Sequence, residues 1–128
     1  NNTAYKNRTN FNLRGRDPQD NRTVIPGRGH VLKNNLGFAG DAEVAELDAV
    51  ASEVSANAFT LPVTITAEDF HGLDEADLVK PRKPNGDLPD VAFLHLAPGS
   101  DAIDRGVDVG RPFKGQAPDL GAFESVKY

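Results

Sequence analysis

The chain contains no cysteine and no methionine, and no run of about 20 apolar residues occurs in its 128 positions. Disulfides, thiolate nucleophiles and cysteine-ligated zinc sites are therefore excluded, because each needs a thiol. No membrane-spanning helix and no secretory signal sequence are predicted. Since the chain does not open on methionine, we expect it to be processed, cleaved from a tag or cut from a longer protein. A secreted protein can lack cysteine, so this absence leaves the compartment open.

The net charge of −5 is divided unevenly along the chain. Residues 5–33 carry seven basic and two acidic side chains, whereas residues 34–128 carry seven basic and seventeen acidic ones. A basic segment on an acidic protein can concentrate anionic ligands. Nucleic acid is not the expected ligand, because no aromatic residues alternate with the arginines of residues 14–28.

Two segments, residues 1–13 and 30–38, each combine an Asn-Asn pair with a short alternating apolar stretch. Short strands with repeated asparagines are typical of a parallel β-helix, in which each coil adds strands to the previous one. Asparagine also tolerates the left-handed backbone that tight corners need. Residues 14–29, rich in Gly, Pro, Asp and Asn, are predicted to form an inserted loop.

The middle of the chain gives mixed signals. In residues 41–58, Val44, Leu47 and Val54 lie at helical spacing, but irregular structure is the preferred interpretation. A strand is predicted over Phe59–Thr66, which is β-branched and alternating, with Pro62 favouring a sheet edge.

Several short elements are predicted in the remaining residues. A capping box over residues 66–69 starts one short helix, and Asp74 caps a second over Glu75–Val79. Asn85-Gly86 predicts a turn and Phe93–Leu96 a short strand. Ser100 is the expected cap of a one-turn helix.

Two glycine- and aspartate-rich segments lie near the end, GSDAIDRGVDVG at residues 99–110 and APDLGAFE at residues 117–124. In this order and spacing they resemble the closing segment of the family 9 pectate lyases, which are right-handed parallel β-helix proteins. The resemblance covers nearly the whole chain. It implies an all-β fold, with the last coils of the β-helix and an inserted basic loop in residues 1–58. Residues 59–128 would form an irregular C-terminal capping segment carrying short helices.

The resemblance also implies a reaction, the calcium-assisted β-elimination of pectate-type polyuronate. A base removes the proton α to the uronate carboxylate, whose charge calcium neutralises. The family's calcium cluster and catalytic lysine lie in earlier coils, so the catalytic centre is expected upstream of Asn1 and no catalytic residue is assigned here. Lys6 and Lys33 lack the nearby aspartates of the family pattern.

The same resemblance sets the expected surroundings of the protein. The expected partners are an acidic plant polysaccharide, pectate or rhamnogalacturonan, and the upstream part of the same protein. No membrane or nucleic-acid partner is expected. The expected location is secreted or periplasmic.

Four arginines of the inserted loop are candidate substrate contacts, because a guanidinium matches a uronate carboxylate through two parallel hydrogen bonds. They are Arg14, Arg16, Arg22 and Arg28. The alternative is that these arginines face solvent or pair with the aspartates of the same loop.

Three aspartates of the turn-rich tail, Asp101, Asp104 and Asp119, are candidate calcium ligands, because turns expose carbonyls beside the carboxylates. The alternative places Asp101 in the first turn of a helix and lets Asp119 accept hydrogen bonds from loop amides.

Two further functions stay open. The chain could be a non-catalytic module that binds acidic polysaccharide through residues 14–28, or a purely structural end of a β-helix. Aromatic residues make up only 7% of the chain, which offers no evident sugar-stacking platform and slightly favours the structural end over the binding module.

Overall fold

The computed structural model describes residues 1–125, so positions 126–128 of the expected capping segment lie outside the described residues. The described part is mostly β, with short strands, two 3₁₀ helices and no α-helix. The strands are β1 (Thr3–Tyr5), β2 (Thr9–Asn12), β3 (Gly15–Arg16), β4 (Val24–Ile25), β5 (Val31–Lys33), β6 (Leu36–Phe38), β7 (Ala42–Ala45) and β8 (Glu53–Ser55). The 3₁₀ helices are η1 (Ala67–Asp69) and η2 (Glu75–Val79). None of these elements is a helix long and apolar enough to cross a membrane.

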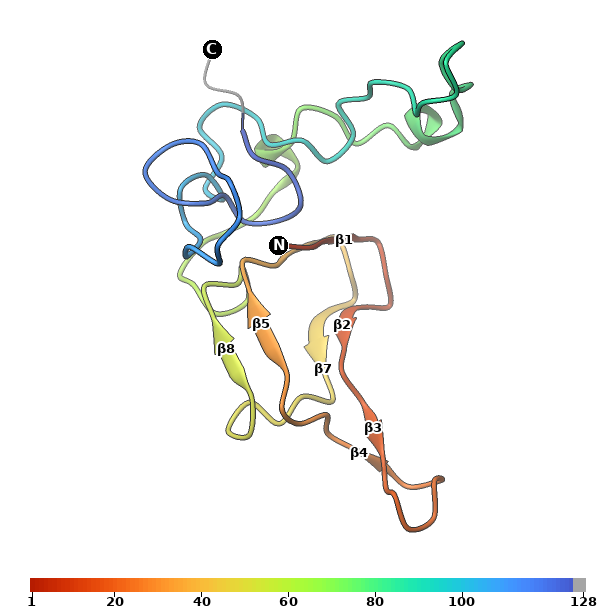
Figure 1. Ribbon diagram of the computed structural model, residues 1–128, viewed down its shortest axis with the longest axis vertical. Coiled ribbons are helices and arrows are strands. Elements are labelled where there is room, and N and C mark those ends of the chain that lie inside the picture. Colours follow the sequence, from red (N-terminus) through yellow and green to blue (C-terminus); the bar gives the residue numbers. More distant parts are fainter. Residues whose placement is uncertain (126–128) are drawn as a thin grey trace.

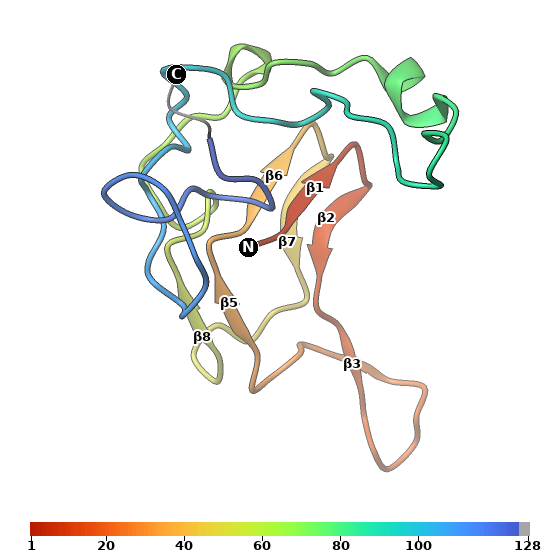
Figure 2. The ribbon, with the colours of Figure 1, turned by 45° about the horizontal axis from the view of Figure 1, so that its top comes forward.

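The strands stack because the chain repeats its path. β6 pairs in parallel with β1, and β7 pairs in parallel with β2 beside it (Figures 1 and 2). β8 then pairs in parallel with β5. Stacked residues are 33 positions apart in the first step, as between Asn2 and Asn35, and 22 apart in the second, as between Asn35 and Asn57. Residues 1–13, 30–45 and 53–57 are therefore successive passes through one stack.

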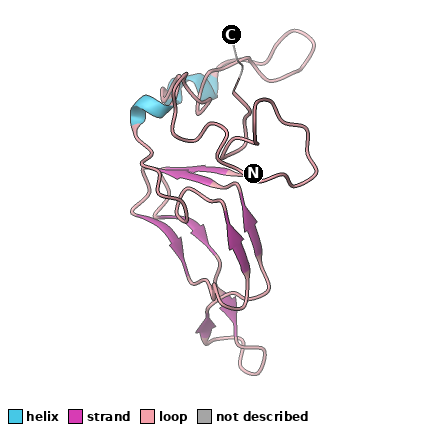
Figure 3. Cartoon of the chain, turned by 90° about the vertical axis from the view of Figure 1, so that its left-hand side faces the viewer, coloured by secondary structure: helices cyan, strands magenta, loops and turns pink. Residues whose placement is uncertain are grey.

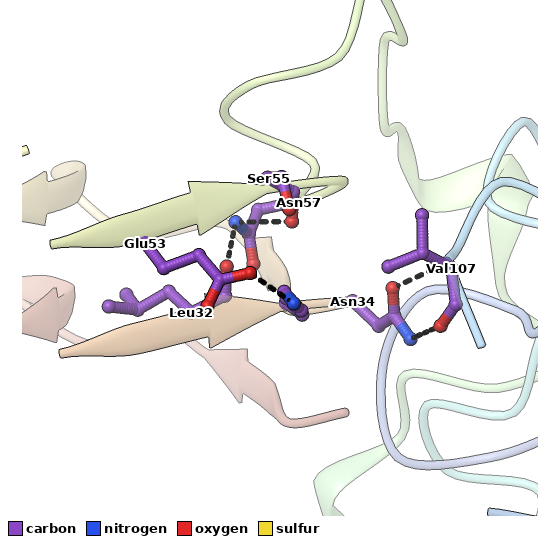
Figure 4. Close-up of polar contacts among 7 residues, drawn as sticks. Leu32, Asn34, Glu53, Ser55, Asn57 and Val107 are labelled. Carbon is purple, nitrogen blue, oxygen red and sulfur yellow. Dashed lines mark hydrogen bonds and ion pairs between the residues drawn. The ribbon is translucent and has the colours of Figure 1, made fainter. Parts of the chain in front are cut away.

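A ladder of asparagine amides joins the three passes. Asn2 donates from Nδ2 to Oδ1 of Asn35 at 2.8 Å, and Asn35 donates from Nδ2 to Oδ1 of Asn57 at 2.7 Å. The backbone N–H groups of Asn2 and Asn35 donate to the same two oxygens. Asn57 is fully buried and ends the ladder by donating to the carbonyls of Leu32 and Ser55 (Figure 4). Each buried amide thus has partners, as burial requires.

The corners of the stack use left-handed backbone. Lys6 and Ala39 occupy equivalent corners of the first and second pass, with φ of 53° each. Asn34 and Ala56 form a second stacked pair of corners, with φ of 57° and 52°. Lysine and alanine rarely adopt this conformation. At these corners the Lys6 N–H donates to the Phe38 carbonyl and the Asn34 N–H donates to the Ala56 carbonyl, so the left-handed residues are bonded to the next pass.

Residues 59–125 lie across one end of the strands (Figures 1 and 3). The main hydrophobic core sits between this segment and the second pass, where Leu36, Phe70, Leu96, Ala102 and Leu120 are buried together. The core therefore joins the stack to the C-terminal segment. The domain boundary at residue 58 stays a prediction.

Several short elements are confirmed. Thr66 and Asp69 form the capping box of η1, and the Asp74 side chain accepts a hydrogen bond from Ala76 N–H at the start of η2. Gly86 has a positive φ of 89° in the expected turn. These features depend on local hydrogen bonds, which short sequence patterns describe well.

The strand expected over Phe59–Thr66 is wrong. The alternation does predict burial, since Leu61, Val63 and Ile65 pack on the core while the residues between them are exposed. Within residues 1–125 no strand pairs with this segment, because residues 60 and 61 fold back to the carbonyl of Asn57 and Pro62 lacks an N–H. An extended segment without a partner is not a strand.

Other expectations in the second half need correction. Phe93–Leu96 forms only isolated bridges, from Phe93 to Gly72 and from Leu96 to Phe70. The one-turn helix after Ser100 is a turn. The Ser100 hydroxyl does accept from Ala102 N–H at 3.2 Å, as expected of a cap, and it donates to Asp69.

Two segments of the first half are more regular than expected. Residues 41–58 contain β7 and β8 rather than wholly irregular structure. The inserted loop at residues 14–29 carries the antiparallel pair β3–β4, which projects from the stack at the bottom of Figure 1.

Replacing Asn57 by alanine is expected to lower the free energy of unfolding by about 2–4 kcal/mol. The change removes the acceptor of two Asn35 hydrogen bonds and leaves the carbonyls of Leu32 and Ser55 without their donor. Urea unfolding measures the effect. Asn7→Ala, at an exposed position, serves as the control and should change the value by less than about 0.5 kcal/mol. Equal effects of the two variants would contradict a structural role for the ladder.

Candidate substrate-binding surface

The hairpin β3–β4 carries two of the four candidate arginines. Arg16 donates from Nη1 to the backbone carbonyl of Arg22 at 2.7 Å, so one guanidinium braces the hairpin itself. Asp20 orders the tip by accepting from the Thr23 hydroxyl at 2.6 Å and from backbone N–H groups. The hydrogen bonds from Thr23 and the amides hold the pKa of Asp20 below its ordinary value. Asp20 thus accepts from the backbone N–H of Arg22 and from Thr23, while the Arg16 side chain bonds a carbonyl.

The other two candidate arginines lie apart from each other. Arg28 forms an ion pair with Asp48, with Nε and Oδ2 3.0 Å apart. Arg14 follows β2 and lines a hollow of about 500 Å³, which is bordered by Arg8, Thr9, Asn12, Arg14, Ala45 and Glu46. Of the four candidates, Arg14 alone borders this hollow, and the structure adds Arg8 to it. The role of all four in substrate binding stays a prediction.

Sequence reasoning counted Arg8 only as part of the basic segment. The signal that could have found it is the alternation around β2. Phe11 and Leu13 line a different hollow, together with Leu32, so Asn12 and Arg14 face the other way. Arg8 precedes the same strand and borders the same hollow.

The candidate calcium ligands are engaged by backbone amides. Asp119 is fully buried and accepts from the N–H groups of Asp104 at 2.8 Å and Ser125 at 2.5 Å. The Asp104 carboxylate accepts from the N–H groups of Gln116 at 2.8 Å and Ala117 at 3.2 Å. Asp119 thus bonds loop amides, which is the alternative stated for it.

Asp101 is exposed, and its backbone N–H donates to Asp69. Within residues 1–125, no group of three or more His, Asp or Glu side chains is placed to hold a metal ion. The assignment of Asp101, Asp104 and Asp119 as calcium ligands stays a prediction.

Both lysines of the coil segments are ion-paired. Lys6 Nζ lies 2.6 Å from Oε1 of Glu75, and this hydrogen bond raises the pKa of Lys6. Lys33 pairs with Glu53 across β5 and β8. A catalytic base needs a lowered lysine pKa near neutral pH, so the environment of Lys6 opposes that role.

The glycine- and aspartate-rich motif clamps onto Asn34. This side chain is fully buried; its Oδ1 accepts from Val107 N–H at 2.8 Å and its Nδ2 donates to the Val107 carbonyl at 2.7 Å (Figure 4). Gly121 N–H donates to the backbone carbonyl of Asn34. A side chain at Gly106 would collide with Asn34, since its Cβ would lie 2.9 Å from the amide. The motif therefore docks the tail onto the second pass.

Asp69 makes a second polar junction inside the C-terminal segment. Its carboxylate accepts from Thr66 N–H at 2.7 Å, the Ser100 hydroxyl at 2.8 Å and Asp101 N–H at 2.8 Å. Burial acts to raise the pKa of Asp69, but these hydrogen bonds together outweigh it and hold the pKa below its ordinary value. The Asn34 junction holds the tail on the second pass, and the Asp69 junction holds the C-terminal segment together.

Comparisons with known proteins show which family the chain resembles. The family model described as "Rhamnogalacturonan lyase-like, C-terminal" matches residues 48–125. Two proteins named pectate lyase L, from Dickeya chrysanthemi and Dickeya dadantii (strain 3937), are 33% and 30% identical over 125 residues. The match covers 97% of this chain and 27% of each relative, so the chain spans about a quarter of their length.

Two solved structures are also similar. A rhamnogalacturonan lyase has 36% identity and a TM-score of 0.66, over 76% of this chain and 24% of its own. The crystal structure of pectate lyase Pel9A has 29% identity and a TM-score of 0.75, over 97% of this chain and 28% of its own. The likeness to Pel9A therefore covers the strand stack and the C-terminal segment alike.

Replacing Asn34 by glycine is expected to lower the free energy of unfolding by about 2–4 kcal/mol. Glycine accepts the positive φ, so the loss reports the missing clamp on Val107 rather than backbone strain. Limited proteolysis should show faster cleavage within residues 106–121. Asn85→Gly, in an exposed turn, is the control. Unchanged cleavage in the Asn34 variant would contradict the docking role.

Replacing Asp69 by asparagine is expected to cost about 1–3 kcal/mol at pH 7 and less at pH 3. The folded-state pKa lies below the ordinary aspartate value of about 3.9. The ionised carboxylate therefore stabilises the fold above that value, and the contribution is lost as the pH falls through the folded-state pKa. Urea unfolding at both pH values measures the difference. Glu68→Gln, at the exposed neighbour, should show no such pH dependence.

Proposed function

Because this chain belongs to the rhamnogalacturonan lyase-like C-terminal family, we propose that it completes a lyase that cleaves pectate-type polyuronate by β-elimination. The observation that carries the proposal is the match of residues 48–125 to that family. The likeness of the chain to the pectate lyases along 97% of its length supports a pectic substrate.

The proposal extends to the architecture. Residues 1–58 would be the last coils of a right-handed parallel β-helix, and residues 59–128 its capping segment. The parallel pairs β1–β6, β2–β7 and β5–β8 and the asparagine ladder support the coils. The clamp of the tail on Asn34 supports the capping role, because the ends of a strand stack need cover.

In the proposed reaction a base removes the proton α to the uronate carboxylate, and the glycosidic bond at the β carbon breaks to leave an unsaturated product. No residue of this chain is assigned to that step. We propose that the base and a calcium ion belong to the upstream part of the protein. Calcium would stabilise the enediolate that develops on the carboxylate. This chain would close the stack and present arginines to the polymer.

The candidate substrate contacts remain Arg14, Arg16, Arg22 and Arg28. Of the four, Arg14 is the best candidate for a substrate contact. Its side chain makes no hydrogen bond or ion pair among the described residues and borders a hollow. Because pectic polysaccharide is a polymer outside the cell that uses it, a secreted or periplasmic location is proposed with it.

A second function is favoured by the same hollow. A non-catalytic module that binds acidic polysaccharide would need only unpaired arginines on a rigid face, and Arg8 and Arg14 provide them. A purely structural end of the stack would need neither.

The protein that contains this chain is expected to release unsaturated uronates from polygalacturonate or rhamnogalacturonan, followed by ultraviolet absorbance. A chelator should stop the release and added calcium should restore it. The isolated chain should release none. Product from the isolated chain would place the base within it, and no product from the whole protein on either polymer would overturn the lyase proposal.

A further inference from the structure

The hollow beside β2 has a fixed wall. Asn12 pairs with Ala45 in the parallel ladder of β2 and β7, and Leu13 N–H donates to the Ala45 carbonyl at 3.1 Å. At the corner that follows, the Glu46 carbonyl accepts from Gly27 N–H at 2.7 Å. The backbone beneath the hollow is therefore held by hydrogen bonds on both sides. The side chains that would contact a ligand are thus attached to backbone whose position is fixed.

The two arginines of the hollow differ from most cations of the basic segment. Lys6, Lys33 and Arg28 are ion-paired, and Arg16 is bonded to a carbonyl. In residues 1–125, the guanidinium groups of Arg8 and Arg14 have no such partner. Unpaired guanidinium groups bind planar oxyanions, carboxylates above all, through paired hydrogen bonds. The charge of the hollow is thus available to a ligand.

The remaining groups of the hollow select among anions. The Glu46 side chain accepts no hydrogen bond within the described part of the chain, and a carboxylate there repels a bare anion such as sulfate. It can, however, accept from hydroxyl groups. Asn12 uses Oδ1 to accept from Arg14 N–H at 3.2 Å, which leaves its Nδ2 to donate outward. The set therefore matches a ligand with both a carboxylate and hydroxyl groups.

We propose that this hollow binds uronic-acid units of an acidic polysaccharide, with Arg8 and Arg14 on carboxylates and Glu46 and Asn12 on hydroxyls. The pectic origin of the ligand rests on the proposed function. The site itself rests on the side chains of this chain and needs no catalytic step.

The test is a calorimetric or NMR titration of the chain with trigalacturonate at low salt. Replacing Arg8 and Arg14 together by glutamine should weaken binding by about tenfold or more. The control is the double variant Arg105→Gln with Arg111→Gln, which removes the same charge from exposed positions outside the hollow. Unchanged unfolding midpoints confirm that the variants fold.

Glu46→Leu gives a sharper test, because it removes both the hydroxyl acceptor and the negative charge. Inorganic sulfate should bind more tightly when the repulsion is removed, whereas trigalacturonate also loses a hydroxyl contact, so the affinity for trigalacturonate relative to that for sulfate should fall. A neutral galactose trimer should bind much more weakly than trigalacturonate to the unaltered chain.

Several outcomes would overturn the site. These are no binding of trigalacturonate, equal weakening by the control pair, or sulfate bound as tightly as trigalacturonate by the unaltered chain. Lyase activity of the whole protein is measured separately. If the whole protein is active but uronate binding is unchanged when Arg8 and Arg14 are replaced, this site is wrong and the proposed function stands. If the chain binds uronate through Arg8 and Arg14 but the whole protein is inactive, the site stands and the proposed function is wrong.

Discussion

The structure depends on buried asparagine amides that satisfy the backbone of a chain with very short strands. Regular ladders provide few hydrogen bonds here, since the strands have two to four residues each. Asn35 and Asn57 link successive passes, and Asn34 links the second pass to the tail. A buried polar group without a partner costs about 1–3 kcal/mol, so Asn35 and Asn57 fix the register of the stack and Asn34 fixes the place of the tail.

The sequence predicted what local chemistry controls. The capping box at Thr66 and Asp69 and the Asp74 cap follow from neighbouring residues, and the two Asn-Asn pairs marked stacked passes. It did not predict β7 and β8, because their pairing partners lie 33 and 22 positions earlier. The left-handed corners at Lys6 and Ala39 were also not predicted, because neither residue type is typical of that conformation. Tertiary pairing decides such positions.

The candidate surface was predicted less well than the fold. Basic residues 14–28 pointed to an anionic ligand, yet Arg16 and Arg28 are held by partners that a linear reading cannot place. Arg8 was missed because its link to Arg14 appears only when the outward direction of β2 is known. The aspartates of the tail looked like ligands for a cation, whereas Asp119 accepts from turn amides. Composition alone does not separate these uses of a carboxylate.

The hairpin β3–β4 sits between two passes without contributing to the amide ladder. Gly27 returns the chain to the stack through its bridge to Leu47. The hydrogen bond between Asn2 and Asn35 therefore does not depend on the length of the hairpin between them. The tip around residues 17–23 is thus insulated from the register of the passes. Lengthening it costs only the slowly growing entropy of loop closure, which makes it a site where relatives can differ and where a foreign peptide can be displayed.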